Sequence, residues 1–177
     1  GVTALYQRDI PQTIILMSQE GIKRKDPDWH AAQVMNFILG SSGFGSRLME
    51  EIREKRGLTY GIYTGISPLD HVSTLTLETS TRNEKTAEVL DLVHKEWVRM
   101  RDTDVTDKEL KDAKDYLTGS MPLALTSTDH ISSMMLSLMM DDLPSTYLDT
   151  VTDKVNAVSI ADVRRVSQSL LTPDKMV

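Results

Sequence analysis

Two side chains suited to stabilising a carbonyl oxygen, Arg53 and Tyr60, stand seven positions apart in the sequence. They belong to residues 43–60, where a glycine-rich turn opens a charged helix that stops at Gly57. We expect Arg53 on the last turn of that helix and Tyr60 on the strand that follows. A fixed cation beside a phenol can hydrogen-bond an oxygen that gains negative charge, as acyl transfer and peptide cleavage require. Because no nucleophile or metal ligand set lies nearby, the stretch predicts half of an active site.

Arg53 and Tyr60 also have a purely structural interpretation. Arg53 can pair with Glu50 on a solvated helix face, and Tyr60 can lie half-buried on a sheet. Surface ion pairs and half-buried tyrosines are both common in folded proteins. Spacing alone therefore favours the structural interpretation, and the chemical one needs support from the surrounding sequence.

No other group of residues predicts a catalytic or metal site. The histidines are scattered and none belongs to an H-x-x-E-H or H-E-x-x-H motif: His30, His71, His94 and His130. The serines lack a partnered histidine and aspartate. Gly43-Phe44-Gly45 lacks the third glycine and the Lys-Ser/Thr pair of nucleotide-binding loops. The methionines within residues 134–140 lie at helical spacing, which predicts core packing rather than a peptide groove.

The composition narrows the class of protein. The chain has 177 residues, and we expect residues 1–177 to form one domain with a sizeable core. With 26 acidic and 20 basic residues and no long run of either sign, it carries no electrostatic signature for nucleic acid. The absence of cysteine excludes disulfides and thiolate metal sites. No apolar window is long enough to span a bilayer and no signal peptide opens the chain, so we expect a soluble protein.

The hydrophobic pattern predicts an α+β fold with an antiparallel or mixed sheet covered by helices. A β-branched run at 13–17 predicts a strand, and residues 58–66 and 72–80 predict an antiparallel hairpin. In the first hairpin strand, alternation places three side chains on one face: Leu58, Tyr60 and Ile62.

Helices fill most of the remaining sequence, with a long helical run after Asn83. Asp26 is predicted to cap a helix that ends at Gly40. The first helix after Asn83 has an apolar stripe: Ala87, Leu90, Val93, Trp97 and Met100. Three later helices have predicted caps, at Thr106 with Glu109, at Thr128 and at Ser159 with Asp162.

Three segments together carry a family resemblance. Residues 38–40, 45–48 and 51–60 closely resemble the signature of the C-terminal, non-zinc half of the pitrilysin/insulinase family of zinc metallopeptidases, which includes mitochondrial processing peptidase and bacterial zinc proteases. Residues 105–110 and 158–163 look like the family's two later helix starts. The resemblance spans nearly the whole chain, and its core motif is long and specific.

The resemblance implies an α+β unit that the family uses twice to build a clamshell. In the catalytic half, an H-x-x-E-H helix and a downstream glutamate hold zinc, and the motif's glutamate activates water. The other half supplies an arginine and a tyrosine, seven positions apart, that reach the substrate near the zinc. These match Arg53 and Tyr60 here. Tyr60 would bond the scissile carbonyl or its oxyanion, and Arg53 would position the peptide backbone.

The sequence departs from the full family pattern because it contains no H-x-x-E-H motif. We therefore expect this chain alone to bind no catalytic zinc and to cleave nothing. Zinc is expected in a missing catalytic half, which is either fused in a longer chain or a separate subunit. The glycine-rich loop is then expected near the substrate or the partner, at Gly40, Gly43 and Gly45.

Two other functions stay open at this stage. The chain can be a catalytically inactive scaffold or assembly subunit, as in relatives that have lost zinc, or a free-standing module that binds peptides at a sheet edge. The sequence leaves the compartment open, and the bacterial periplasm or cytoplasm is expected. Whether the parent protein is an active enzyme depends on the other half.

Overall fold

The structure is a computed structural model that describes residues 10–43, 45–69 and 71–176. Its sheet has three strands, β1 (Gln12–Glu20), β2 (Ile62–Pro68) and β3 (Ser73–Arg82). Both β1 and β2 pair with β3 in antiparallel register, so the strand order is β1-β3-β2. The predicted α+β fold and hairpin are confirmed, and the described sheet is antiparallel rather than mixed.

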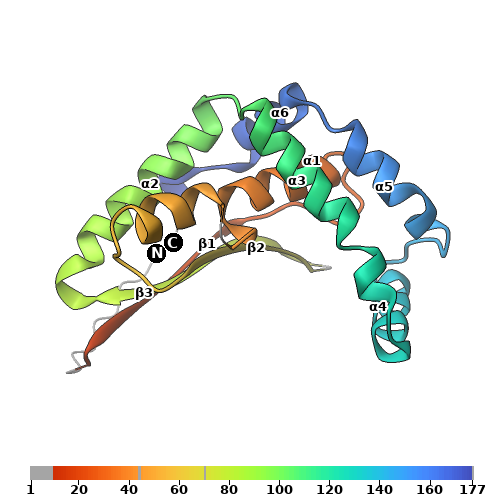
Figure 1. The fold of residues 1–177 in the computed structure, drawn as a ribbon, viewed down its shortest axis with the longest axis horizontal. Coiled ribbons are helices and arrows are strands. Elements are labelled where there is room, and N and C mark those ends of the chain that lie inside the picture. Colours follow the sequence, from red (N-terminus) through yellow and green to blue (C-terminus); the bar gives the residue numbers. More distant parts are fainter. Residues whose placement is uncertain (1–9, 44, 70, 177) are drawn as a thin grey trace.

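The helices form a layer over one face of the sheet, and α4 extends away from that layer (Figure 1). Two π-helical turns, Phe37–Ser41 and Met49–Glu54, lie between the helix that follows β1 and the β2–β3 hairpin. The α-helices are α1 (Trp29–Asn36), α2 (Thr86–Asp102), α3 (Asp107–Gly119), α4 (Thr128–Met140), α5 (Tyr147–Ala157) and α6 (Ile160–Leu170). None of the described helices has both the length and the apolar character needed to cross a bilayer.

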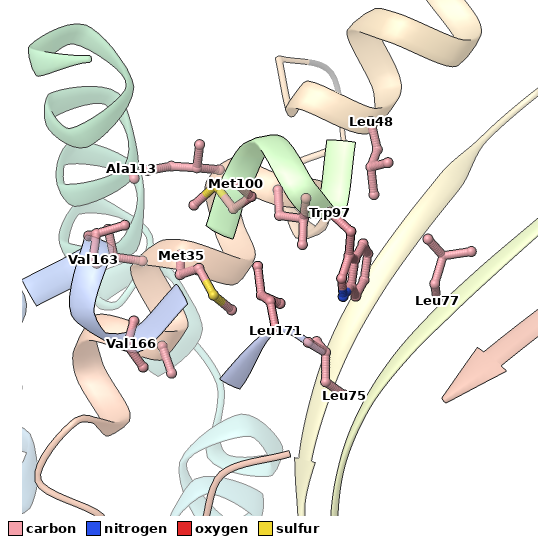
Figure 2. Close-up of a cluster of buried hydrophobic side chains, with 14 of the residues drawn as sticks. Met35, Leu48, Leu75, Leu77, Trp97, Met100, Ala113, Val163, Val166 and Leu171 are labelled. Carbon is pink, nitrogen blue, oxygen red and sulfur yellow. The ribbon is translucent and has the colours of Figure 1, made fainter. Parts of the chain in front are cut away.

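The core lies between the sheet and this helical layer. Alternation along β3 sends Leu75 and Leu77 toward the helices, and both are buried. Figure 2 shows Trp97 of α2 reaching toward these two strand residues, and its indole is fully buried. The Trp97 Nε1–H donates a hydrogen bond of 2.9 Å to Gln19 Oε1, which satisfies the one polar atom of that ring.

Two predicted helix starts are wrong by a few residues. Helix α1 begins at Trp29 instead of following Asp26 directly. The Asp26 carboxylate accepts a hydrogen bond of 2.8 Å from the Asp28 N–H, so it closes a tight turn before the helix. The cap of α4 is Ser127 rather than Thr128, since the Ser127 hydroxyl accepts from the His130 N–H at 3.2 Å.

The predicted stripe of α2 is wrong at its N-terminal end. Ala87 and Leu90 are exposed, and Val89 and Leu92 are buried in their place. Val89 lies four positions before Val93 and eleven before Met100, so the helical period places these three residues on one buried face. The predicted burial of the later positions is confirmed: Val93, Trp97 and Met100.

The expectation that the methionines of α4 fill the core is also wrong. Of the described residues in this helix only Leu138 is buried, whereas Met139 is 75% exposed and Met140 is 73% exposed. Helical periodicity identified the helix but not whether a neighbouring element covers it.

Candidate functional site

The chain turns sharply between Arg53 and Tyr60. Gly57 has a φ of 60°, and its N–H donates to the Arg53 carbonyl at 2.8 Å. The Leu58 N–H donates to the Ile52 carbonyl at 3.1 Å. These two bonds end the helix with Gly57 in the left-handed backbone conformation, which favours glycine. Leu58 is then buried, so it anchors the segment that carries Tyr60.

Tyr60 lies before β2 rather than on it, and the residue is 89% exposed. The predictions that it is half-buried and shares a face with Leu58 and Ile62 are therefore wrong. The cause is Thr59, whose hydroxyl lies 2.7 Å from the Ser80 carbonyl and 2.8 Å from the Gly61 carbonyl. This side chain holds the bend against β3 and turns the Tyr60 ring out to solvent.

Arg53 and Tyr60 lie side by side on the surface. The guanidinium carbon of Arg53 is 5.8 Å from the centre of the Tyr60 ring, a cation–π distance. Arg53 also forms an ion pair with the neighbouring Glu54. The structure thus presents a phenolic hydroxyl and a guanidinium together, both as hydrogen-bond donors.

Glycine is needed at the three positions of the predicted loop for different structural reasons. A Cβ on Gly40 would lie 2.6 Å from Thr64 Oγ1, so Gly40 allows the first π-helical turn to pack on β2. Gly43 and Gly45 have φ values of 65° and 103°, where a side chain is strained. These two shape the turn that precedes the helix of Arg53. Their predicted nearness to a substrate or a partner stays a prediction.

A partly buried ion pair that the sequence did not predict fixes this helix in place. Arg47 Nε donates to Glu109 Oε1 at 2.6 Å, and Arg47 Nη2 donates to Oε2 at 3.0 Å. Burial alone would raise the pKa of Glu109, but hydrogen bonds from Arg47 and from the Thr106 N–H lower it to about 2. The sequence signal for this pair was the position of Arg47 next to Leu48, whose side chain is buried in the core.

Glu109 also closes the predicted capping box of α3, which is confirmed. Its carboxylate accepts from the Thr106 N–H at 2.7 Å, and the Thr106 hydroxyl accepts from the Glu109 N–H at 3.2 Å. The same arrangement at Ser159 and Asp162 begins α6 and is confirmed as well. One carboxylate therefore joins the start of α3 to the helix that carries Arg53.

The fold is that of the inactive domains of peptidases. A solved structure described as the peptidase M16 inactive domain from Pseudomonas fluorescens is 36% identical to this chain, with a TM-score of 0.87 over 95% of this chain and 40% of that one. The Peptidase M16 inactive domain family model matches residues 1–117. The chain therefore belongs to this family, which confirms the resemblance seen in the sequence.

Two curated relatives are named in contrasting ways. The Helicobacter pylori protein "Non-peptidase homolog YmxG" is 33% identical over 146 residues, covering 80% of this chain and 33% of that protein. An uncharacterized zinc protease from Streptomyces coelicolor is 29% identical and covers 99% of this chain and 40% of that protein. The chain thus spans between a third and two fifths of the length of these relatives. A structure of Complex III2 from Candida albicans, 14% identical with a TM-score of 0.81, shares the fold.

The residues described here do not fit the zinc centre that the family uses. Among them no three histidine, aspartate or glutamate side chains gather closely enough to hold a metal ion. His30 stacks on Tyr147 with ring centres 6.0 Å apart, and His94 lies 3.8 Å from Asp174 on the surface. In the part of the chain that is described, the candidate site consists of the two donors, Arg53 and Tyr60, and their role stays a prediction.

Proposed function

We propose that this chain is the non-catalytic half of a zinc metalloendopeptidase. In this role it binds the peptide substrate and completes the active site of an H-x-x-E-H-bearing half through Arg53 and Tyr60. The observation that carries the proposal is that Tyr60 is 89% exposed and that its ring centre lies 5.8 Å from the guanidinium carbon of Arg53. An exposed phenol beside a guanidinium presents two kinds of hydrogen-bond donor to a ligand, which supports this role.

The proposed chemistry uses hydrogen-bond donors that are already in place. The Tyr60 hydroxyl would donate to the scissile carbonyl oxygen, and its bond would strengthen as that oxygen gains charge. The Arg53 guanidinium would bind backbone carbonyls of the peptide and hold it against Tyr60. Neither residue takes up or releases a proton in this proposal.

Rigid neighbours support this proposal. The turn at Gly57 fixes the end of the helix that carries Arg53, and Thr59 fixes the segment that carries Tyr60. The partly buried Arg47–Glu109 pair attaches that helix to α3. Donors held by such contacts need little rearrangement when charge develops on a bound oxygen, which is the condition for effective stabilisation.

The test is steady-state cleavage of a peptide by the protein assembled with its H-x-x-E-H-bearing half. Tyr60→Phe is expected to lower kcat by about ten- to a thousandfold, as for loss of one oxyanion donor, and Arg53→Ala is expected to lower kcat because the peptide is no longer held against Tyr60. Tyr63→Phe is the matched control, because Tyr63 is also an exposed tyrosine, on β2, and it should leave kcat unchanged. Unchanged kcat in both test variants would contradict the proposal.

The second candidate is an inactive scaffold or assembly subunit. The name of the Helicobacter pylori relative, a non-peptidase homolog at 33% identity, favours it. The full reading frame and its neighbours separate the two candidates, since a scaffold needs no H-x-x-E-H motif. The scaffold role is supported by three results together. The reading frame and its neighbours lack the motif, the assembled protein cleaves no peptide, and Tyr60→Phe leaves assembly intact.

A further inference from the structure

Exposed apolar side chains gather on α4 and on the short turn before it, Pro122–Leu125. Seven of the sixteen large apolar residues that are exposed in the described part of the chain lie in these two elements. We name them the α4 surface: Leu123, Leu125, Ile131, Met135, Leu136, Met139 and Met140. So dense an apolar patch is rare on a monomeric soluble protein and marks an interaction site.

Helix geometry makes this patch continuous. Ile131, Met135 and Met139 follow one another at intervals of four residues and form one row along α4. Leu136 and Met140 form the neighbouring row, so that apolar side chains cover about half of the helix circumference. A helix whose apolar face is this wide is normally covered by another element.

The domain itself covers only a small part of α4. Leu138 is its one buried residue among those described, and it borders an apolar cavity of about 190 Å³ shared with Leu117 and Val151. Two residues further along, at the last residue of the helix, Met140 lines a surface groove with Leu69 of the β2–β3 hairpin. Figure 1 shows α4 extending beyond the helical layer, which presents the α4 surface at one end of the domain.

We infer that the α4 surface is an interface for the H-x-x-E-H-bearing half, an inference that takes its partner from the proposed function. The chain spans 40% of the Pseudomonas fluorescens protein and 33% of the Helicobacter pylori one, so in these relatives most of the polypeptide lies outside this domain. A lasting contact with that remainder needs an apolar core, and methionine is enriched at such cores.

A second copy of this chain fits the α4 surface less well. Asp129 lies in the first turn of the helix, and Asp141 and Asp142 follow its last residue. Two copies paired about a twofold axis with their helices parallel would set one Asp129 against the other. Arg24 and Lys25 bind the C-terminal pair of acids, but no ion pair involving Asp129 is found among the described residues.

Hydroxyl-radical footprinting tests the interface directly. The isolated chain is compared with the intact protein that contains the H-x-x-E-H-bearing half. Modification of Met139 and Met140 is expected to fall severalfold in the intact protein, because an interface excludes water from the residues that it covers. Leu90, an exposed apolar residue of α2, is the control and should be modified equally in both. Equal modification of the two methionines in both samples would overturn the inference.

A pair of substitutions tests the same surface by stability. Leu136→Lys with Met139→Lys should lower the unfolding temperature of the intact protein and leave that of the isolated chain unchanged, because its α4 surface already faces water. Leu90→Lys should have the same effect on both samples. Equal shifts for the paired substitution would overturn the inference, as would a dimer of the isolated chain that these substitutions dissociate. Tyr60→Phe should not alter either result, so a failure of the catalytic role is distinguished from a failure of the α4 interface.

Discussion

Arg47 and Glu109 stand 62 positions apart in the sequence and form an ion pair with two hydrogen bonds, of 2.6 and 3.0 Å. The Arg47 side chain is 6% exposed and that of Glu109 is 26% exposed. The pair joins the helix that carries Arg53 to the start of α3. The position of the candidate site therefore depends on a contact that lies away from it.

Breaking this pair should destabilise the fold. Arg47→Met leaves the Glu109 carboxylate partly buried without its cation, which is expected to cost about 3 kcal/mol of unfolding free energy. Urea unfolding measures the loss. Lys111→Met is the matched control, because it breaks an exposed pair with Asp115 on the same helix and should cause no measurable change. Equal stability of the two variants would show that the buried pair contributes nothing.

The low pKa of Glu109 predicts how stability depends on acid. Its pKa is about 2 in the folded protein against 4.5 ordinarily, so the unfolded chain binds the proton first as pH falls. The stabilisation is complete above about pH 4.5 and is lost as pH falls toward 2. Glu109→Gln should therefore be less stable than the wild type near neutral pH, with a difference that shrinks across this window. A difference independent of pH would contradict the assignment.

His30 predicts a second acid window at higher pH. Burial, together with the charges of Lys154 and Arg24, lowers the pKa of His30 from 6.5 to about 4. Between these values the unfolded chain binds a proton that the folded one does not, so stability falls as pH falls from 6.5 toward 4. The His30→Gln variant should lose less stability than the wild type over that range, as measured by urea unfolding at each pH. Lys154→Met should narrow the range without removing it, because burial remains.

Gly40 is predicted to tolerate no side chain. An alanine Cβ would lie 2.6 Å from Thr64 Oγ1 and 3.0 Å from a methyl group of Leu48, so the helix must shift away from β2. Gly40→Ala is expected to cost about 2 kcal/mol in thermal unfolding. Gly65→Ala is the control, since its Cβ would meet Thr76 Oγ1 at an ordinary 3.6 Å. The prediction fails if both variants unfold like the wild type.

Features fixed by a few neighbouring residues were predictable from the sequence. The capping boxes at Thr106 and Ser159 depend on a hydroxyl and a carboxylate three positions apart, and both form as expected. The buried face of β3 follows from alternation, and the helix end at Gly57 follows from glycine's freedom to take a positive φ. The long signature around Arg53 supplied the family.

Features fixed by distant parts of the chain were not predictable. The exposure of the Tyr60 side chain is decided by the hydrogen bond from the Thr59 hydroxyl to the Ser80 carbonyl, 21 positions away in sequence. The Arg47–Glu109 pair needs the packing of two helices, which no local pattern encodes. The exposure of Met139 depends on what lies beside α4, and an apolar helix pattern is the same whether its cover is internal or a partner.

The single-turnover rate of peptide cleavage, measured with saturating assembled enzyme, tests the central claim most directly because it isolates the chemical step from substrate binding. Tyr60→Phe removes one hydroxyl from an exposed ring and leaves the fold unchanged. We predict that this rate falls at least about tenfold in Tyr60→Phe and stays at the wild-type value in Tyr63→Phe. A wild-type rate in Tyr60→Phe would contradict the claim that this chain completes a peptidase active site through Tyr60.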